Sequence, residues 1–285
     1  MIVVTLLWSI AGLVSRHLDS ARSFEVTFWR SFFTALTLSV ALTLLRGPSL
    51  WRGVRRWPRE LWMSGVCWAI MFTAFMVAIT LTTVANVLVM MAIGPLVTAV
   101  FARIFLHHRQ PARTWMAIAL AGIGIAWMFG HEAASGAWLA GSLVALAVPL
   151  AAAINWTILQ RDNRHLTPDA PDMLPAVWIG ALLSVAATLP LAWPFQASTH
   201  DLGLLALLGS LQLAVPCLLV VHLARVLPGP EIALLALLEV IFGVAWAWLG
   251  AGETPSSATL SGGATVLVAL VGNEILALWR QPART

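Results

Sequence analysis

Glu239 is a carboxylate inside the apolar stretch 231–251, about eight residues from the start of that stretch. In a helix this distance corresponds to roughly 12 Å of depth at 1.5 Å per residue. A carboxyl group in such surroundings can bind an amine or exchange a proton, and it can also accept hydrogen bonds that tie helices together. Spacings of three and four residues place it on one helix face with Phe242 and Trp246. The sequence leaves both the binding and the structural interpretation open.

Amide side chains also interrupt the apolar stretches, at Asn86, Asn155 and Gln212. Their N–H groups could donate to the carboxylate of a bound solute, and they could equally hold neighbouring helices together. Glu25 and Arg30 lie about one helical turn apart and could pair as a structural contact.

Motifs that would support catalysis or metal binding are absent from the sequence. Cys67 and Cys217 both lie in apolar stretches, with no metal-ligand spacing around them. The pair His107-His108 has no carboxylate partner, and neither HExxH nor GxxxxGK[ST] occurs. We therefore predict no catalytic residue, no metal and no cofactor.

Composition indicates a membrane protein. Sixty per cent of the residues are apolar and only ten per cent are charged, whereas soluble proteins have about 25% charged residues. A water-soluble fold could not bury this much apolar surface, but a lipid bilayer can accommodate it. All sixteen basic residues are arginines, which we interpret as the mark of a GC-rich bacterial genome and not of nucleic-acid binding. The expected location is the bacterial inner membrane, crossed many times.

Ten apolar stretches predict an all-α membrane protein with ten transmembrane helices. Most reach the ~20 residues that a helix needs to cross the hydrocarbon layer. The first is short, but Ser15-Arg16 lacks the small residues of a signal-peptide cleavage site. No soluble domain fits between the stretches, because the longest connection, Arg46 to Glu60, has about fifteen residues. The approximate ranges are 1–15, 24–45, 61–81, 84–106, 114–130, 138–160, 173–195, 202–223, 231–251 and 257–279.

The chain repeats its pattern after 145 residues, since residues 85–127 and 230–272 share an apolar run, a short hinge and a second apolar run. We predict two five-helix repeats, at 1–130 and 138–279. Five is odd, so the second repeat would enter the membrane upside down, with a central cavity near mid-membrane between the two. Duplicated hydrophobic units of this kind are typical of membrane transporters.

Arginine sets the predicted orientation. If the N-terminus is cytoplasmic, the inside loops hold twelve arginines and the outside loops hold two, Arg16 and Arg22. Cytoplasmic loops of membrane proteins carry an excess of basic residues. Both termini are therefore predicted to be cytoplasmic.

A resemblance to a known family is carried by four sets of residues. They are Trp8 in the first stretch, Arg30 within FWRSFF in the second, ANVLVMMAIGPLVTAVFARIFL in the fourth and PEIALLALLEVIFGVAWAWLGAGE in the ninth. On these residues the chain resembles the EamA-type family of the drug/metabolite transporter superfamily, and within it the YddG-like branch of bacterial exporters of aromatic and other amino acids. It departs from the family at His107-His108, where Gly-Glu is usual, and at Val240, where proline is frequent.

The resemblance implies which helices surround the cavity: the first, third, fourth and sixth, with the eighth and ninth as repeat mates. A wall of tryptophan, phenylalanine and methionine there would suit apolar or aromatic side chains. Packing or lipid contact is the alternative for any single one. The candidate cavity residues are Trp8, Trp68, Phe72, Asn86, Met90, Trp156, Gln212, Glu239 and Trp246, with Phe75 and Met91 on the same wall.

For function, the resemblance implies a secondary transporter that exports amino acids or related small metabolites by alternating access, with Glu239 as the candidate for proton coupling. Export of drugs or other metabolites by facilitated diffusion is the alternative. An integral membrane enzyme is the rival class. Glycines in the fifth and tenth stretches, such as Gly124 and Gly262, would allow close helix contacts, including those of a homodimer.

Overall fold

The structure is a computed structural model, which describes residues 1–15, 17–21, 23–81, 87, 90–133, 138–163, 172–251 and 256–279. All regular elements in these residues are helical, as expected for an all-α protein. Those before residue 134 are α1 (Ile2–Ser15), α2 (Ser23–Arg46), the 3₁₀ helix η1 (Pro48–Arg56), α3 (Arg59–Leu81), α5 (Gly94–Phe105) and α6 (Ala112–Ala133). Those that follow are α7 (Trp138–Asn163), α8 (Leu174–Ala192), α9 (Thr199–Leu207), the π-helical turn η2 (Leu208–Ala214), α10 (Val215–Leu223), α11 (Gly229–Ala236), α12 (Leu238–Ala251) and α13 (Ser257–Trp279).

Six segments of the described chain are long and apolar enough to cross a membrane. They are Phe24–Arg46, Arg59–Ile79, Ala140–Arg161, Leu174–Ala192, Thr199–Leu223 and Gly229–Trp246. Four further apolar helices are shorter: Ile2–Ser15, Gly94–Phe105, Ala112–Trp127 and Ser257–Asn273. The helix ends otherwise follow the apolar stretches closely, and residues 257–279 coincide with α13.

Three of the predicted stretches are not single α-helices, and the first of these is 84–106. Helix α5 begins only at Gly94, after a turn at residues 92–93. Pro95 explains the break, because proline has no N–H to donate and its ring clashes with the preceding turn, so it suits the start of a helix better than its interior. Around the turn the Ile93 N–H donates to the Met90 carbonyl at 3.3 Å.

The stretch 231–251 is divided into α11 and α12 at Leu237. Here the Leu237 N–H donates to the Leu234 carbonyl and the Val240 N–H donates to the Leu237 carbonyl, both at 3.1 Å. Each bond spans three residues, which tightens the backbone relative to an α-helix. Neither proline nor glycine marks this turn in the sequence, yet it lies 145 residues after the turn at residue 92.

The stretch 202–223 contains the π-helical turn η2 between α9 and α10. Pro216 follows it directly and has no N–H for the carbonyl one turn earlier. The Val215 N–H reaches the Ser210 carbonyl, five residues back, which widens the turn and shifts the side chains around the helix. Gln212 lies within this widened turn.

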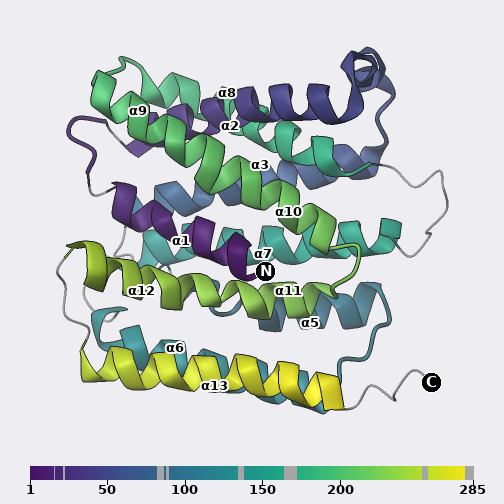
Figure 1. Cartoon of the computed structure of the whole chain (residues 1–285), viewed down its shortest axis with the longest axis vertical. Coiled ribbons are helices and arrows are strands. Elements are labelled where there is room, and N and C mark those ends of the chain that lie inside the picture. Colours follow the sequence, from purple (N-terminus) through teal and green to yellow (C-terminus); the bar gives the residue numbers. More distant parts are fainter. Residues whose placement is uncertain are drawn as a thin grey trace.

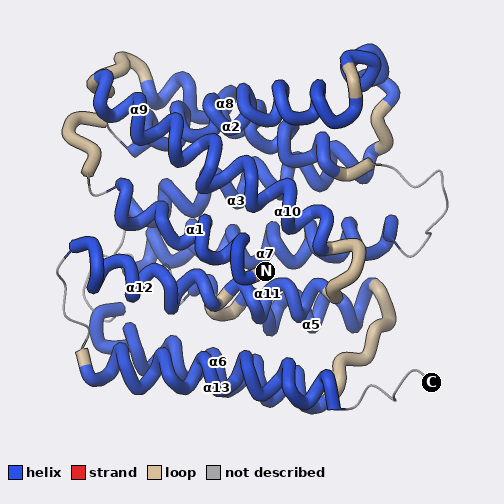
Figure 2. Tube along the Cα trace, in the orientation of Figure 1, coloured by secondary structure: helices blue, strands red, loops and turns tan. Residues whose placement is uncertain are grey.

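The helices lie side by side, with their loops at two opposite ends of the bundle (Figures 1 and 2). Helices α2 and α8 pack together at one edge, and α6 and α13 pack together at the opposite edge. Between these edges α3 packs on α7, α1 on α12, and α5 on both α7 and α11. The middle of the bundle is therefore built by helices from both halves of the sequence.

Two buried carboxylates tie the chain together at one end of the bundle. Asp201 accepts hydrogen bonds from the backbone N–H groups of Asp19, Ser20 and Ala21 at 2.8–3.2 Å. Glu25 accepts from the N–H groups of Gln196 and Ala197, each at 2.8 Å. The loop before α2 is thereby fixed to the loop before α9.

An ion-pair cluster ties three helices together at the other end. The Arg46 Nε lies 2.6 Å from the Asp172 Oδ2, and the Arg225 Nη2 lies 3.7 Å from the Asp172 Oδ1. These residues lie at the end of α2, before α8 and after α10. All three side chains are partly exposed to solvent, so the cluster contributes little to stability on its own.

The contact between α2 and η2 predicts the effect of one small substitution. A Cβ added at Gly209 would lie 2.5 Å from the Arg30 carbonyl oxygen and 2.7 Å from the Phe33 Cβ. We expect Gly209→Ala to lower the free energy of unfolding by about 1–3 kcal/mol, because backbone cannot move aside as a side chain can. The measurement is the melting temperature of the purified protein in detergent.

Gly203→Ala is the matched control, since Gly203 lies in the preceding helix α9 and has no atom within 4 Å of an added Cβ. We expect its melting temperature to equal or slightly exceed that of the wild type. An equal loss in both variants would contradict the close packing of α2 on η2.

Candidate functional site

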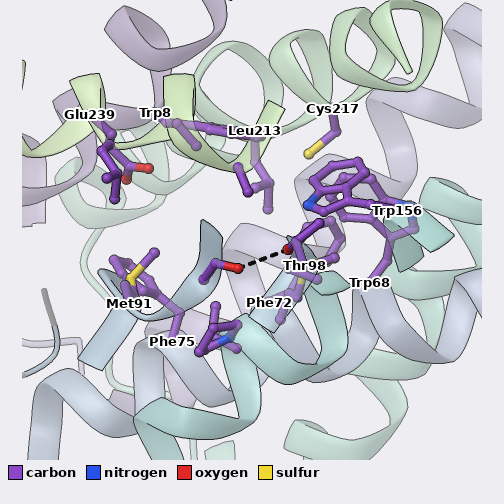
Figure 3. A pocket seen from close by; sticks show the side chains of 18 of the residues that line it. Trp8, Trp68, Phe72, Phe75, Met91, Thr98, Trp156, Leu213, Cys217 and Glu239 are labelled. Atoms are coloured by element: carbon purple, nitrogen blue, oxygen red, sulfur yellow. Dashed lines mark hydrogen bonds between the residues drawn. The ribbon is translucent and has the colours of Figure 1, made fainter. Parts of the chain in front are cut away.

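A cavity of about 150 Å³ lies in the middle of the bundle, where the interrupted helices meet. Its wall includes residues of α1, α2, α3, α5, α7, η2, α10, α11 and α12. Figure 3 shows Glu239 and Trp8 on one side of this space, with Trp68 and Trp156 toward the other. Both halves of the sequence therefore contribute to a single site.

Aromatic rings form the apolar part of the wall. The Trp68 ring lies 5.6 Å from the Phe72 ring and 5.8 Å from the Trp156 ring, centroid to centroid, the last pair nearly perpendicular at 87°. Such edge-to-face contacts are favourable because the ring edge is positive and the face negative. A Cβ on Gly180 would overlap the Trp68 Cβ, so α3 and α8 pack closely here and fix the position of the ring.

The interruptions in the helices open onto this cavity. Gly94 and Pro95 line it from the start of α5, and Leu237 and Glu239 line it from the turn between α11 and α12. The carbonyl of Gly94 accepts a hydrogen bond from the Thr98 Oγ1 at 2.8 Å (Figure 3). This bond joins two residues four apart in the first turn of α5.

Besides Thr98, three strongly polar side chains lie in the cavity wall: Arg30, Gln212 and Glu239. The Gln212 Nε2 donates to the Trp8 carbonyl at 3.0 Å, which ties η2 to α1. Arg30 supplies a basic side chain to the wall, and Glu239 supplies an acidic one. The cavity is therefore apolar over most of its wall, with one positive and one negative side chain. Such a site has the means to bind a small solute by both ends and by its apolar part.

Six of the nine residues predicted for the cavity line it: Trp8, Trp68, Phe72, Trp156, Gln212 and Glu239. Phe75 and Met91, expected on the same wall, line it as well.

The other three lie elsewhere. Met90 packs against the cluster of Ala78, Val87 and Ala145; Met91 packs against the same cluster but also lines the cavity. Trp246 donates from its Nε1 to the Ser9 Oγ at 3.0 Å, a contact between α12 and α1. Asn86 is outside the described residues.

Two further polar predictions are resolved by hydrogen bonds. The Asn155 Oδ1 accepts from the Ser64 Oγ at 2.6 Å, so this amide holds α7 to α3. The pairing of Glu25 with Arg30 was wrong: Glu25 bonds to backbone N–H groups near the start of α9, whereas Arg30 faces the cavity. A charge in the middle of an apolar stretch was the signal in the sequence that Arg30 needed a cavity or a partner.

Known proteins resemble this chain in fold. Residues 1–130 match the EamA-like transporter family. A solved structure entitled only "Crystal structure of protein" has a TM-score of 0.78 and 16% sequence identity, and the alignment covers 99% of this chain and 97% of that one. At this identity the likeness shows the fold alone. No curated protein matches the chain. The apolar helices and the family match together indicate an integral membrane protein.

The different surroundings of Met90 and Met91 can be tested by chemical labelling. In a protein with Cys67 and Cys217 replaced by alanine, we expect Met91→Cys to react with a small thiol reagent several-fold faster than Met90→Cys. Both positions pack against the same apolar cluster, but only position 91 also borders the cavity. Mass spectrometry of the detergent-solubilised protein measures both rates. Equal rates, or faster labelling at position 90, would contradict the described cavity wall.

Proposed function

We propose that this protein is a secondary transporter that moves small solutes across a membrane by alternating access. The observation that carries the proposal is the cavity at the helix interruptions, to which both halves of the chain contribute. Discontinuous helices around a shared central site are typical of transporters, because unwound backbone at membrane depth is tolerated where it lines a cavity. The match of residues 1–130 to the EamA-like transporter family supports the same conclusion.

Helix pairing supports an inverted repeat of two five-helix units. If every helix is replaced by the helix that lies 145 residues away in the sequence, several pairs of helices in contact are turned into other pairs that are also in contact. The contact of α1 with α12 corresponds to that of α7 with α5, and the contact of α3 with α7 corresponds to that of α10 with α1. The pairs α2 with α8 and α6 with α13 each correspond to themselves.

The arginine bias supports the orientation with both termini in the cytoplasm. Arg46 and Arg225 meet at Asp172 at one end of the bundle, and both belong to loops assigned to the cytoplasm. Arg113 donates to the Leu276 carbonyl, which joins the start of α6 to the end of α13. With the arginine-only composition, this supports a place in the inner membrane of a bacterium.

For the substrate, we propose amino acids with an apolar or aromatic side chain, exported from the cytoplasm. The aromatic wall supplies dispersion and ring contacts for such a side chain, and Glu239 provides an acceptor for its amine. The direction and the class of substrate rest on the resemblance to amino acid exporters. Under this mechanism, solute enters from the cytoplasm and leaves when the two repeats rock against each other.

Solute flux tests the proposal directly. We expect liposomes that contain only this protein to exchange a labelled neutral amino acid with unlabelled amino acid on the other side. A panel of cationic drugs and other metabolites in the same assay examines the alternative substrates. Liposomes that exchange none of these solutes, with protein shown to be folded and inserted, would contradict transport.

Glu239→Gln tests proton coupling through the carboxylate in the cavity. We expect a proton gradient directed inward to accelerate export by the wild type and to have no effect on the variant, because glutamine cannot exchange a proton. Glu60→Gln is the control, since Glu60 is exposed in the first turn of α3 and does not line the cavity. A folded Glu239→Gln protein with an unchanged response to the gradient would rule out coupling at this residue, and facilitated diffusion would replace it.

A further inference from the structure

Arg30 is a buried cation within a membrane-spanning helix. It lies in the apolar segment Phe24–Arg46, its side chain is only 3% exposed, and it borders the central cavity. A charged side chain at this depth is costly and is found where it faces a cavity or a partner of opposite charge. The contacts of its guanidinium therefore indicate which role this residue has.

The hydrogen bonds of the Arg30 guanidinium are incomplete. Its Nη1 lies 3.0 Å from the Met76 Sδ, a thioether that accepts only weakly. Its Nε has no hydrogen-bond partner among the described residues. Among the described residues, no carboxylate lies close enough to the Arg30 guanidinium to form an ion pair. Because a guanidinium presents a planar fork of donors, its natural partner is a carboxylate that accepts two parallel bonds.

The backbone that carries Arg30 is held firmly against η2. The Thr34 Oγ1 donates both to the Arg30 carbonyl at 2.7 Å and to the Gly209 carbonyl at 2.9 Å. Gly209 has no side chain, which lets α2 approach this closely. Gln212 follows three residues later, so one rigid contact positions the guanidinium and the amide in the same wall. A binding residue held in this way needs little reorganisation when its ligand arrives.

The hydrogen-bond acceptors in the cavity wall suit a cation, whereas Arg30 suits an anion. The Gln212 Nε2 donates a hydrogen bond to the Trp8 carbonyl, and the Gln212 Oε1 has no hydrogen-bond partner among the described residues. Glu239 provides a carboxylate in the same wall. These oxygens suit an ammonium group. The sequence suggested that amides would bind a solute carboxylate, but one of the two N–H groups of the Gln212 amide is used by the bond to Trp8.

We propose that Arg30 binds the carboxylate of a zwitterionic solute, while Glu239 and the Gln212 Oε1 accept from its ammonium group. This inference rests on the proposed transport function and adds to it a residue that selects the substrate. The apolar side chain of the solute would then lie against Trp68, Phe72 and Trp156.

The test compares amino acids with amines that lack only the carboxylate. The probes are neutral L-amino acids and, for each, the decarboxylated amine, for example L-phenylalanine and 2-phenylethylamine. We expect the wild type to bind at least one amino acid about 10-fold or more tightly than its amine, since a charged hydrogen bond is lost. Binding is measured with radiolabelled probes on purified protein.

Arg30→Gln should weaken binding of the amino acid by about 10- to 100-fold and leave binding of the amine within about twofold. Arg30→Lys keeps the charge but loses the fork, and should give a smaller loss. Arg103→Gln is the matched control, because Arg103 lies exposed in α5 and does not line the cavity. We expect it to bind both probes as the wild type does.

The possible outcomes separate this inference from the proposed function. An equal loss of amino acid and amine in Arg30→Gln would overturn the carboxylate contact and give Arg30 a structural role. A wild type that prefers the amine, or transports only solutes without a carboxylate, would overturn it while leaving transport intact. A wild type that neither binds nor transports any probe would overturn both. If Arg30→Gln does not fold, the preference of the wild type and the result with Arg30→Lys decide.

Discussion

Every backbone N–H and C=O group that lies in hydrocarbon must find a hydrogen-bond partner within the protein. A continuous α-helix meets this requirement at all of its interior residues, so most of the chain remains helical from one end of the bundle to the other. Departures from the α-helix are costly and are tolerated where they face protein or a cavity. In this molecule, the breaks in the α-helices at residues 92–93, at Leu237 and at η2 border the central cavity.

The three interruptions, at residues 92–93, at Leu237 and at η2, explain why a cavity forms at this depth. Residues within or directly after the interruptions line the cavity wall, among them Gly94, Glu239 and Gln212. The turns at residue 92 and at Leu237 lie 145 residues apart in the sequence, and residues at or next to both turns line the cavity.

Polar groups are arranged differently at the ends of the bundle and in its middle. At one end, Glu25 and Asp201 are satisfied by backbone N–H groups, which fixes the loops. In the middle, Arg30 and Gln212 each retain a polar atom without a partner in the described chain. The end contacts are complete and serve stability, whereas the incomplete set in the cavity leaves bonding capacity for a solute.

Much of the fold was predictable from the sequence, because apolar stretches of membrane length can only be helices. Pro95 marks the interruption before α5, and Pro216 marks the π-helical turn that contains Gln212. The break at Leu237 was not predictable, since its flanking leucines favour a continuous helix and only the tertiary structure interrupts it.

The aromatic wall followed from the positions of Trp8, Trp68 and Trp156, but the choice between Met90 and Met91 did not. Both methionines pack against the cluster of Ala78, Val87 and Ala145, and only Met91 also lines the cavity. Arg30 was assigned to Glu25 because the two are close in the sequence. The actual partners of Glu25, Gln196 and Ala197, lie about 170 residues away along the chain, beyond the reach of local spacing.

The account depends most on two five-helix units that enter the membrane in opposite directions and share one cavity. The decisive measurement is the sidedness of two corresponding hinges, with Gln110→Cys and Ser256→Cys placed one at a time in a cysteine-free protein. A membrane-impermeant maleimide is applied to sealed vesicles of known orientation. The account predicts that position 110 is labelled only from the cytoplasmic side and position 256 only from the opposite side. Labelling of both positions from the same side would contradict it.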